Sequence, residues 1–234
     1  MSLVLISRTM SKLGDCRREI VEKYPNIDVK VIQADFERLD IYDHIENELK
    51  DIDIGMLVNN VGAALDPMHP LDQQDRETIM KMINLNMTSV AMTTQIVIGR
   101  LKEKRRGVVI NISSATAILP PLFIIYSTAK AWVRRFSYGL RLQYRKYGVI
   151  VQDVEPLFVR TKLAPSANDP SMIEPETCAR ESLLTVGHYD ETAGAVRHEL
   201  FTFVFSLIPE FLMVKTLEGN VEKAMKELEA KKAN

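Results

Sequence analysis

Short apolar runs alternate along the chain with longer stretches in which apolar side chains recur at helical spacing. The short runs have the length and composition of buried strands, and the longer stretches have the period of amphipathic helices. This alternation predicts an α/β fold in which helices cover both faces of a parallel sheet. We expect strands at residues 3–7, 29–33, 56–58, 108–112 and 149–154, and helices at residues 11–24, 41–50, 75–100 and 126–147.

The pattern changes after the last of these strands. Prolines and polar residues cluster there, which favours a loop or lid over about residues 162–186. Nearly half of the final residues, 218–234, are charged, which predicts a surface helix. Because 234 residues suit one well-buried domain, we expect an α/β domain over residues 1–217 and a charged tail over residues 218–234.

Composition narrows the class of ligand. Hydrophobic residues make up 46% and charged residues 26% of the chain, which are ordinary globular values. The formal net charge of -1 gives no electrostatic case for nucleic acid, so we expect a small-molecule ligand. Cys16 and Cys178 form neither a metal-ligand spacing nor a disulfide framework, which predicts no metal and a reducing compartment.

The sequence gives little sign of a membrane span. The first apolar run is followed at once by Arg8 and lacks a cleavage region, so we expect no signal peptide. No apolar run reaches the roughly 20 residues that cross a bilayer. The aromatic run at residues 201–213 fits either an interfacial or substrate-entry surface or a buried final strand and helix.

One stretch carries a specific chemistry. Tyr126-Ser-Thr-Ala-Lys130 places a phenol and an ammonium on one face of a helix. A nearby cation favours phenolate, so we expect Lys130 to lower the pKa of Tyr126 and make it a usable acid or base. A hydroxyl from Asn111-Ile-Ser-Ser114 could hold the substrate oxygen while charge develops on it. These groups suit carbonyl reduction, although any surface helix can produce such a pair.

Two further stretches carry asparagine. Asn59-Asn60-Val61-Gly62 directly follows a strand, where small polar side chains and a flexible glycine let the backbone approach a ligand. A plain β-turn is the alternative. Asn84-Leu-Asn86 lies inside a predicted helix, where asparagine is mildly unfavourable, so either a compensating role or an exposed polar face explains it.

Taken together and in this order, these stretches resemble the short-chain dehydrogenase/reductase family over about residues 3–194. The resemblance is greatest to the 17-beta-hydroxysteroid dehydrogenase and 3-ketoacyl-CoA reductase group. It implies a Rossmann-like doubly wound parallel sheet and an NADP(H)-dependent oxidoreductase of lipid metabolism or steroid biosynthesis. Its substrate would carry a keto or hydroxy group on a steroid or a fatty-acyl chain. The matching stretches are Val4-Leu-Ile-Ser-Arg-Thr9, Asn111-Ile-Ser-Ser114, Leu119-Pro120, Ile125-Tyr-Ser-Thr-Ala-Lys130 and Phe158-Val-Arg-Thr-Lys-Leu163.

The resemblance implies a role for each catalytic candidate. Tyr126 matches the acid/base, and Lys130 matches the group that lowers its pKa and binds the nicotinamide ribose. Ser114 matches the residue that orients the carbonyl, and Asn86 matches the helix asparagine that supports a water in the proton relay. The family's usual serine-to-tyrosine spacing would select Ser113 instead, whereas the Asn-Ile-x-Ser pattern selects Ser114.

The resemblance also implies cofactor contacts beyond Tyr126 and Lys130. Arg8 matches the basic residue that pairs with the 2'-phosphate of NADP, a group that suits the bidentate geometry of a guanidinium. Asp35 matches the acidic residue beside the adenine. Asn60 matches the turn residue near the adenosine ribose, and Thr161 matches the contact to the nicotinamide carboxamide.

The chain departs from the family at its start. Family members begin with a strand and a Thr-Gly-x3-Gly-x-Gly turn whose backbone approaches the pyrophosphate. No such turn occurs in this sequence, so we expect the first strand to be missing and the sheet to break between the strands at residues 3–7 and 56–58. The alternatives to an active reductase are therefore a catalytically inactive truncated isoform, incomplete gene model or pseudoenzyme, and a lipid-binding module that uses residues 201–213.

The end of the chain resembles a targeting signal. Lys231-Lys232-Ala-Asn234 matches the dilysine retrieval motif of endoplasmic reticulum membrane proteins, which predicts the cytosolic face of that organelle. The alternative is a solubilising tail on a cytoplasmic protein. Peripheral membrane association and homodimerisation through the long helices also follow from the resemblance.

Overall fold

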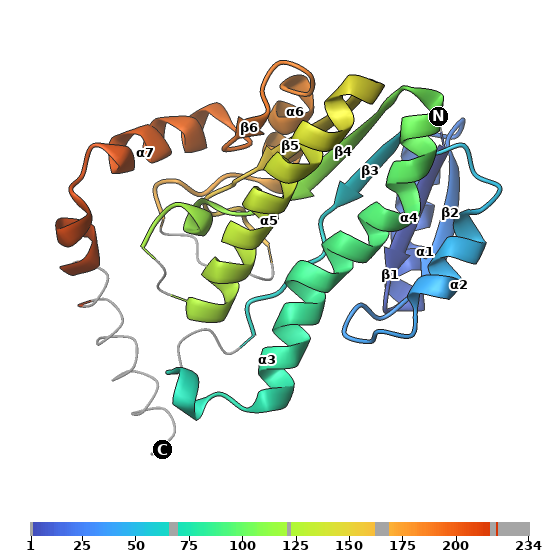
Figure 1. Cartoon of the computed structure of the whole chain (residues 1–234). Coiled ribbons are helices and arrows are strands. Elements are labelled where there is room, and N and C mark those ends of the chain that lie inside the picture. Colours follow the sequence, from blue (N-terminus) through green and yellow to red (C-terminus); the bar gives the residue numbers. More distant parts are fainter. Residues whose placement is uncertain (1, 66–69, 121–122, 162–168, 216–218, 220–234) are drawn as a thin grey trace. The chain divides into compact units, whose positions relative to one another are not determined.

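The computed structural model describes residues 2–65, 70–120, 123–161, 169–215 and 219 (Figure 1). The chain divides into two compact units, Met1–Asp53 and Ile54–Asn234. The predicted domain of residues 1–217 stays a prediction, and the predicted tail helix lies outside the described residues.

The first unit is built on a pair of parallel strands. Strand β1 runs in register with β2 from Ser2 opposite Asp28 to Ser7 opposite Gln33. Helix α1 joins the two strands, as a parallel connection requires. The buried side chains of β2 are Val29 and Ile32, which lie three residues apart and so point to opposite faces of the strand pair. The elements are β1 Ser2–Ser7, α1 Met10–Lys23, β2 Asp28–Gln33 and α2 Tyr42–Leu49, and the core includes Leu13, Val29, Ile32, Ile45 and Leu49.

The second unit is built on a four-stranded parallel sheet in the order β3-β4-β5-β6. Most residues of the two central strands are buried, because helices and neighbouring strands shield them from water, and most are β-branched. Val109 and Val151 are among the most buried side chains. The strands are β3 Met56–Asn59, β4 Gly107–Ile112, β5 Val149–Val154 and β6 Glu191–Thr192.

Two long helices cover one face of this sheet. Helix α4 packs on β3 and β4, and α5 packs on β4 and β5 (Figure 1). The sequence predicted one helix over residues 75–100, but the structure interrupts that helix with a π-helical turn. Here the helices are α3 Arg76–Ile83, the π-helix η2 Asn84–Thr88, α4 Ser89–Lys104, α5 Ile124–Tyr144, α6 Pro175–Leu184 and α7 Val196–Ser206, with short 3-10 turns at η1 Leu71–Gln73, η3 Ala115–Ala117 and η4 Arg145–Tyr147.

A buried polar network joins these two helices to the sheet. The Asn59 amide donates to Thr94 Oγ1 at 2.9 Å and to Asn111 Oδ1 at 2.8 Å. The Asn111 amide donates in turn to Ser137 Oγ at 2.8 Å. Asn59 and Asn111 are register neighbours on β3 and β4, so their side chains lie on the same face. Because each buried polar atom finds a partner, the network fixes how α4 and α5 sit on the strands.

The strands agree with the sequence predictions to within one residue at each end, and β6 is an additional strand. The strands that begin at Ser2 and Met56 belong to different sheets, as the predicted break requires. Part of the predicted lid is helix α6, and residues 162–168 lie outside the described part of the chain. Among the described helices, none combines the length and apolar character that a bilayer crossing requires.

Candidate active site

The candidate catalytic residues gather where strands β3 and β4 end. In a parallel α/β sheet, loops at the carboxyl ends of the strands form the usual place for a ligand. Gly62 follows β3 and Ser114 follows β4, while Tyr126 and Lys130 come from the first turns of α5. Helix α5 packs against the 3-10 turn that Ser114 caps, which brings the serine and the tyrosine together.

The two candidate serines have different hydrogen-bond partners. The Ser114 hydroxyl hydrogen-bonds with the Tyr126 side chain and also accepts from the Thr116 backbone N–H. The Ser113 hydroxyl donates to Asp153 Oδ2 at 2.9 Å, beneath the site. Ser113 is 2% exposed, so a substrate oxygen could not reach it without displacing the surrounding core. Ser114, which the Asn-Ile-x-Ser pattern selects, is the serine on the Tyr126 side of the site, and its role in orienting a carbonyl stays a prediction.

Lys130 lies one helical turn after Tyr126 and is almost fully buried. Its Nζ donates to the backbone oxygen of Ile112 at 2.9 Å and lies 5.6 Å from the centre of the Tyr126 ring. Burial lowers the pKa of this ammonium to about 8, and the Asp153 carboxylate opposes that effect. Lys130 is thus held against the tyrosine and the end of β4, with its charge state sensitive to mildly alkaline pH.

The expected lowering of the Tyr126 pKa is not what this structure shows. Burial raises the pKa of the Tyr126 phenol, and the hydrogen bond with Ser114 only partly opposes the rise. The physical reason is that removing water penalises a phenolate more than nearby dipoles stabilise it. Tyr126 is therefore a neutral phenol at neutral pH, which is the form that can donate a proton.

Asn86 ties the π-helical turn to the loop after β3. Its Oδ1 accepts from the Ala63 N–H at 3.2 Å, and its Nδ2 donates to the oxygens of Ala63 and Met82 at 2.8 and 2.9 Å. A Cβ added to Gly62 would lie 2.9 Å from Asn86 Oδ1 and 3.1 Å from Lys130 Nζ. Only a glycine fits between these two groups, and the π-helical turn is a feature often found at functional sites.

The predicted cofactor residues fall in both units. In the second unit, Asn60 and Thr161 are exposed, as residues that contact a ligand can be. Thr161, with the buried amine of Lys130, would lie at the nicotinamide half of NADP(H), whereas Asn60 would lie near the adenosine ribose. In the first unit, Arg8 Nη1 forms an ion pair with Glu37 Oε1 at 2.6 Å, and Asp35 accepts from the Glu37 N–H. A 2'-phosphate on Arg8 would therefore compete with Glu37.

Sequence reasoning missed an acidic pair beneath the site. Asp153 and Glu155 are 0% and 7% exposed, although carboxylates are rarely buried without a partner. The alternation Asp153-Val-Glu155 at the end of an apolar strand places both side chains on one face. The sequence did contain a signal for this pair, because two acidic residues stand at alternate positions at the end of an apolar strand.

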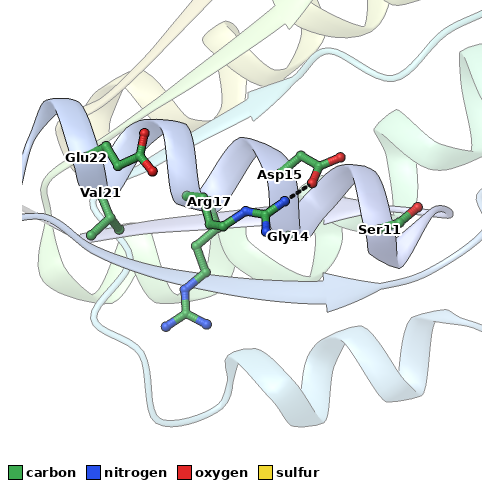
Figure 2. A pocket seen from close by; sticks show the side chains of 7 residues that line it. Ser11, Gly14, Asp15, Arg17, Val21 and Glu22 are labelled. Atoms are coloured by element: carbon green, nitrogen blue, oxygen red, sulfur yellow. Dashed lines mark hydrogen bonds and ion pairs between the residues drawn. The ribbon is translucent and has the colours of Figure 1, made fainter.

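Other features of the described chain do not add to this site. An open groove runs along α1 and contains none of the predicted site residues (Figure 2). An Asp15–Arg18 ion pair lies along the helix there. Among the described residues, no cluster of three or more His, Cys, Asp or Glu side chains has the arrangement of a metal site. Ser114, Tyr126, Lys130 and Asn86 therefore remain the candidate catalytic residues.

Known proteins resemble this chain in sequence and in structure. Among relatives, the very-long-chain 3-oxoacyl-CoA reductase of Anas platyrhynchos is 42% identical over 225 residues, 93% of this chain and 71% of the relative. The 17-beta-hydroxysteroid dehydrogenase type 3 of Rattus norvegicus is 41% identical over 213 residues, 89% of this chain and 69% of the relative. The solved short-chain dehydrogenase from Sphingobium yanoikuyae in complex with NADPH is 28% identical with a TM-score of 0.75, over 82% of this chain and 76% of that one.

The family model described as short chain dehydrogenase matches residues 1–171, which include β1 through β5 and the four candidate catalytic residues. Both relatives carry names of oxidoreductases, in agreement with the group that the motifs indicated. From its sequence and its fold, the chain belongs to the short-chain dehydrogenase/reductase family.

Proposed function

We propose that this protein is an NADP(H)-dependent oxidoreductase that acts on a keto or hydroxy group of a fatty-acyl or steroid substrate. The observation that carries the proposal is the contact between Ser114 and a Tyr126 phenol that burial keeps protonated, beside the buried amine of Lys130. The names of the two relatives suggest the substrate class. One is named as a reductase of 3-oxoacyl-CoA and the other as a dehydrogenase of 17-beta-hydroxysteroids.

In the reducing direction the chain supplies a hydrogen bond and a proton. NADPH, when bound, supplies the hydride that a carbonyl carbon accepts. Ser114 holds the carbonyl oxygen, and Tyr126 transfers its phenolic proton to that oxygen as the C=O bond becomes C–OH. The Lys130 cation, close to the tyrosine ring, stabilises the phenolate that remains. Asn86 keeps the loop at Gly62 in place beside Lys130.

The alternative function is a non-catalytic protein that keeps the site but does not bind the cofactor. It is favoured by one specific observation, which is that the 234 residues contain no Gly-x3-Gly-x-Gly turn. Such a turn presents backbone N–H groups to the pyrophosphate, and no other group named above replaces it. The two functions differ first in their affinity for NADPH.

We expect the purified 234-residue chain to bind NADPH weakly or not at all in isothermal titration calorimetry. The reasons are the absent glycine-rich turn and the ion pair that already engages Arg8. A known NADPH-binding dehydrogenase, measured alongside, checks the titrant. Micromolar affinity would contradict this expectation and remove the argument for the non-catalytic alternative. If binding is weak, assays of NADPH oxidation at millimolar NADPH, with a 3-ketoacyl-CoA and with a 17-ketosteroid, decide whether turnover occurs.

We also propose that helix α7 contacts a lipid surface. Val196, Leu200, Phe203 and Leu207 recur at helical spacing, and each is more than 60% exposed. The opposite side of the helix includes His198, which is fully buried. An apolar stripe of this size on one helix face suits the interfacial region of a membrane, and lipid substrates would enter from there.

Charge placed in the stripe should release the chain from lipid. We expect the protein to float with vesicles of phosphatidylcholine and phosphatidylserine, and Phe203→Asp to weaken that binding about tenfold or more, because a buried aromatic contributes about 1.5–3 kcal/mol. Leu39→Asp, an exposed leucine of the first unit, is the control and should leave flotation unchanged. Equal flotation of wild type and Phe203→Asp would exclude α7 as the membrane contact.

Localisation and assembly remain predictions. The dilysine-like motif at residues 231–234 lies outside the described residues. We propose that the protein is located on the cytosolic face of the endoplasmic reticulum, and this rests on the motif and on the resemblance. The proposal of a homodimer rests on the resemblance alone.

A further inference from the structure

We propose that Asp153 and Glu155 share one proton beneath the active site, and that Asp153 is a positioning residue that sets the charge state of Lys130. The role for Lys130 rests on the proposed function, whereas the shared proton does not. The two carboxyl groups lie at the end of β5, directly below the serine pair that follows β4.

The contacts of Asp153 show why a proton is needed. Asp153 is fully buried, and its Oδ2 accepts from Ser113 at 2.9 Å. Its Oδ1 meets no N–H or O–H donor among the described residues. The Glu155 carboxyl, two residues further along the chain, also interacts with the Asp153 side chain and raises its pKa. Two carboxyl groups can form a hydrogen bond only if one of them carries a proton, because an ionised carboxylate has no donor.

The cations nearby decide which acid keeps the proton. Arg134, on α5, donates to Glu155 Oε1 at 2.6 Å and to Glu191 Oε2 at 2.7 Å. Arg141, also on α5, binds the other oxygen of Glu191 at 2.8 Å. Glu155 therefore has a direct cationic partner and Asp153 does not. The proton belongs on Asp153, and the negative charge belongs on Glu155.

The groups that face Asp153 come from all the elements around it. Lys130 approaches from α5, Glu191 from β6, Ser113 from the end of β4, and Glu155 from the residue just after β5. Burial, and then the Glu155 charge, raise the pKa of Asp153 to about 8, while Ser113 opposes the rise. Lys130 titrates in the same range, because burial lowers its pKa to about 8.

Because the pKa values of Asp153 and Lys130 are similar, the protonation of Asp153 affects the charge of Lys130. Below about pH 8 the neutral Asp153 carboxyl adds no charge beside Lys130. When Asp153 loses its proton, its negative charge favours the Lys130 ammonium. Lys130 then stays charged to a higher pH than it would beside a neutral residue. Asp153 hydrogen-bonds with Ser113 and its charge acts on Lys130, so we assign it a positioning role through Lys130.

The shared proton is tested without cofactor or turnover. Carboxyl ¹³C NMR of the ligand-free chain, with the Asp153 signal assigned by its loss in Asp153→Asn, should give a titration midpoint near pH 8. An ordinary aspartate titrates at about pH 4. A midpoint below about pH 5 would overturn the proposal.

A second measurement uses the pH dependence of stability. The folded-state pKa of Asp153 is raised, so its favourable contribution is complete below the unfolded pKa and is lost as pH rises through the folded one. The wild type should therefore lose stability relative to Asp153→Asn between about pH 4 and pH 8. Asp51→Asn, at an exposed position, should follow the wild type at every pH. A constant difference between wild type and Asp153→Asn over that range would also overturn the proposal.

The positioning role has its own readout. If NADPH oxidation is measurable, Asp153→Asn should match the wild type near pH 6.5. As the pH rises, the variant should lose activity at a lower pH than the wild type does, because its Lys130 loses the proton at a lower pH. A merely structural role would lower activity equally at all pH values. Failure of turnover would reject the proposed function but leave the carboxyl titration valid, so the two outcomes are distinguishable.

Discussion

Tyr126→Phe should lower the rate of ketone reduction by about 100-fold to 10,000-fold, because a positioned general acid contributes an acceleration of that order. The substitution removes only the phenolic oxygen. Its ring remains beside Lys130, and the lost hydrogen bond with Ser114 should cost about 0.5–1.5 kcal/mol of the free energy of unfolding. The measurement is NADPH oxidation at millimolar cofactor with a 3-ketoacyl-CoA and with a 17-ketosteroid.

The same helix offers a matched control for this variant. Tyr138 lies on α5 with 42% of its surface exposed, and Tyr138→Phe should leave the rate unchanged. Reduction should hold at neutral pH, since burial keeps the Tyr126 proton in place, and decline above about pH 8 as Lys130 loses its charge. A Tyr126→Phe enzyme as fast as the wild type would exclude Tyr126 as the acid.

Asn86→Ala should destabilise the chain by about 1.5–4.5 kcal/mol, because three hydrogen bonds contribute about 0.5–1.5 kcal/mol each. The variant leaves the N–H and the oxygen of Ala63 and the oxygen of Met82 without their side-chain partner. The measurement is urea unfolding at neutral pH. We also expect any turnover to fall, because the loop at Gly62 would no longer be fixed beside Lys130.

Two further variants sharpen the test of Asn86. Asn47→Ala, at an exposed position of helix α2, should change the unfolding free energy by less than about 0.5 kcal/mol. Asn86→Asp keeps the acceptor for the Ala63 N–H but loses both donors and buries a charge, so it should be at least as damaging as alanine. If Asn86→Ala were as stable as the wild type, the link between the π-helical turn and the loop would not matter.

The sequence alone predicted most of the fold, because the period of apolar residues directly reflects which faces are buried. The sequence predicts strands at residues 108–112 and 149–154, and the structure confirms both as strands of a parallel sheet. The order of Asn86, Ser114, Tyr126 and Lys130 also indicated the family without any coordinates. These features depend on residue type and local spacing, which the sequence states outright.

The tertiary structure alone decided the questions that depend on direction and burial. Ser113 and Ser114 are adjacent in sequence, but one hydroxyl turns toward Asp153 and the other toward Tyr126. Spacing could not distinguish them, because neighbouring side chains at a strand end point to opposite sides. The π-helical turn likewise depends on Asn86 meeting a loop 23 residues earlier in the chain.

The directions in which the pKa values of Tyr126 and Lys130 shift also depend on burial, which the sequence does not show. A sequence shows that Lys130 lies near Tyr126, and a nearby cation by itself would lower the phenol's pKa. The removal of water around both groups depends on how α5 packs against the ends of the strands, and here that burial raises the pKa of Tyr126 and lowers the pKa of Lys130. Residue spacing therefore determined which groups could meet, and packing determined the protonation states in which they meet.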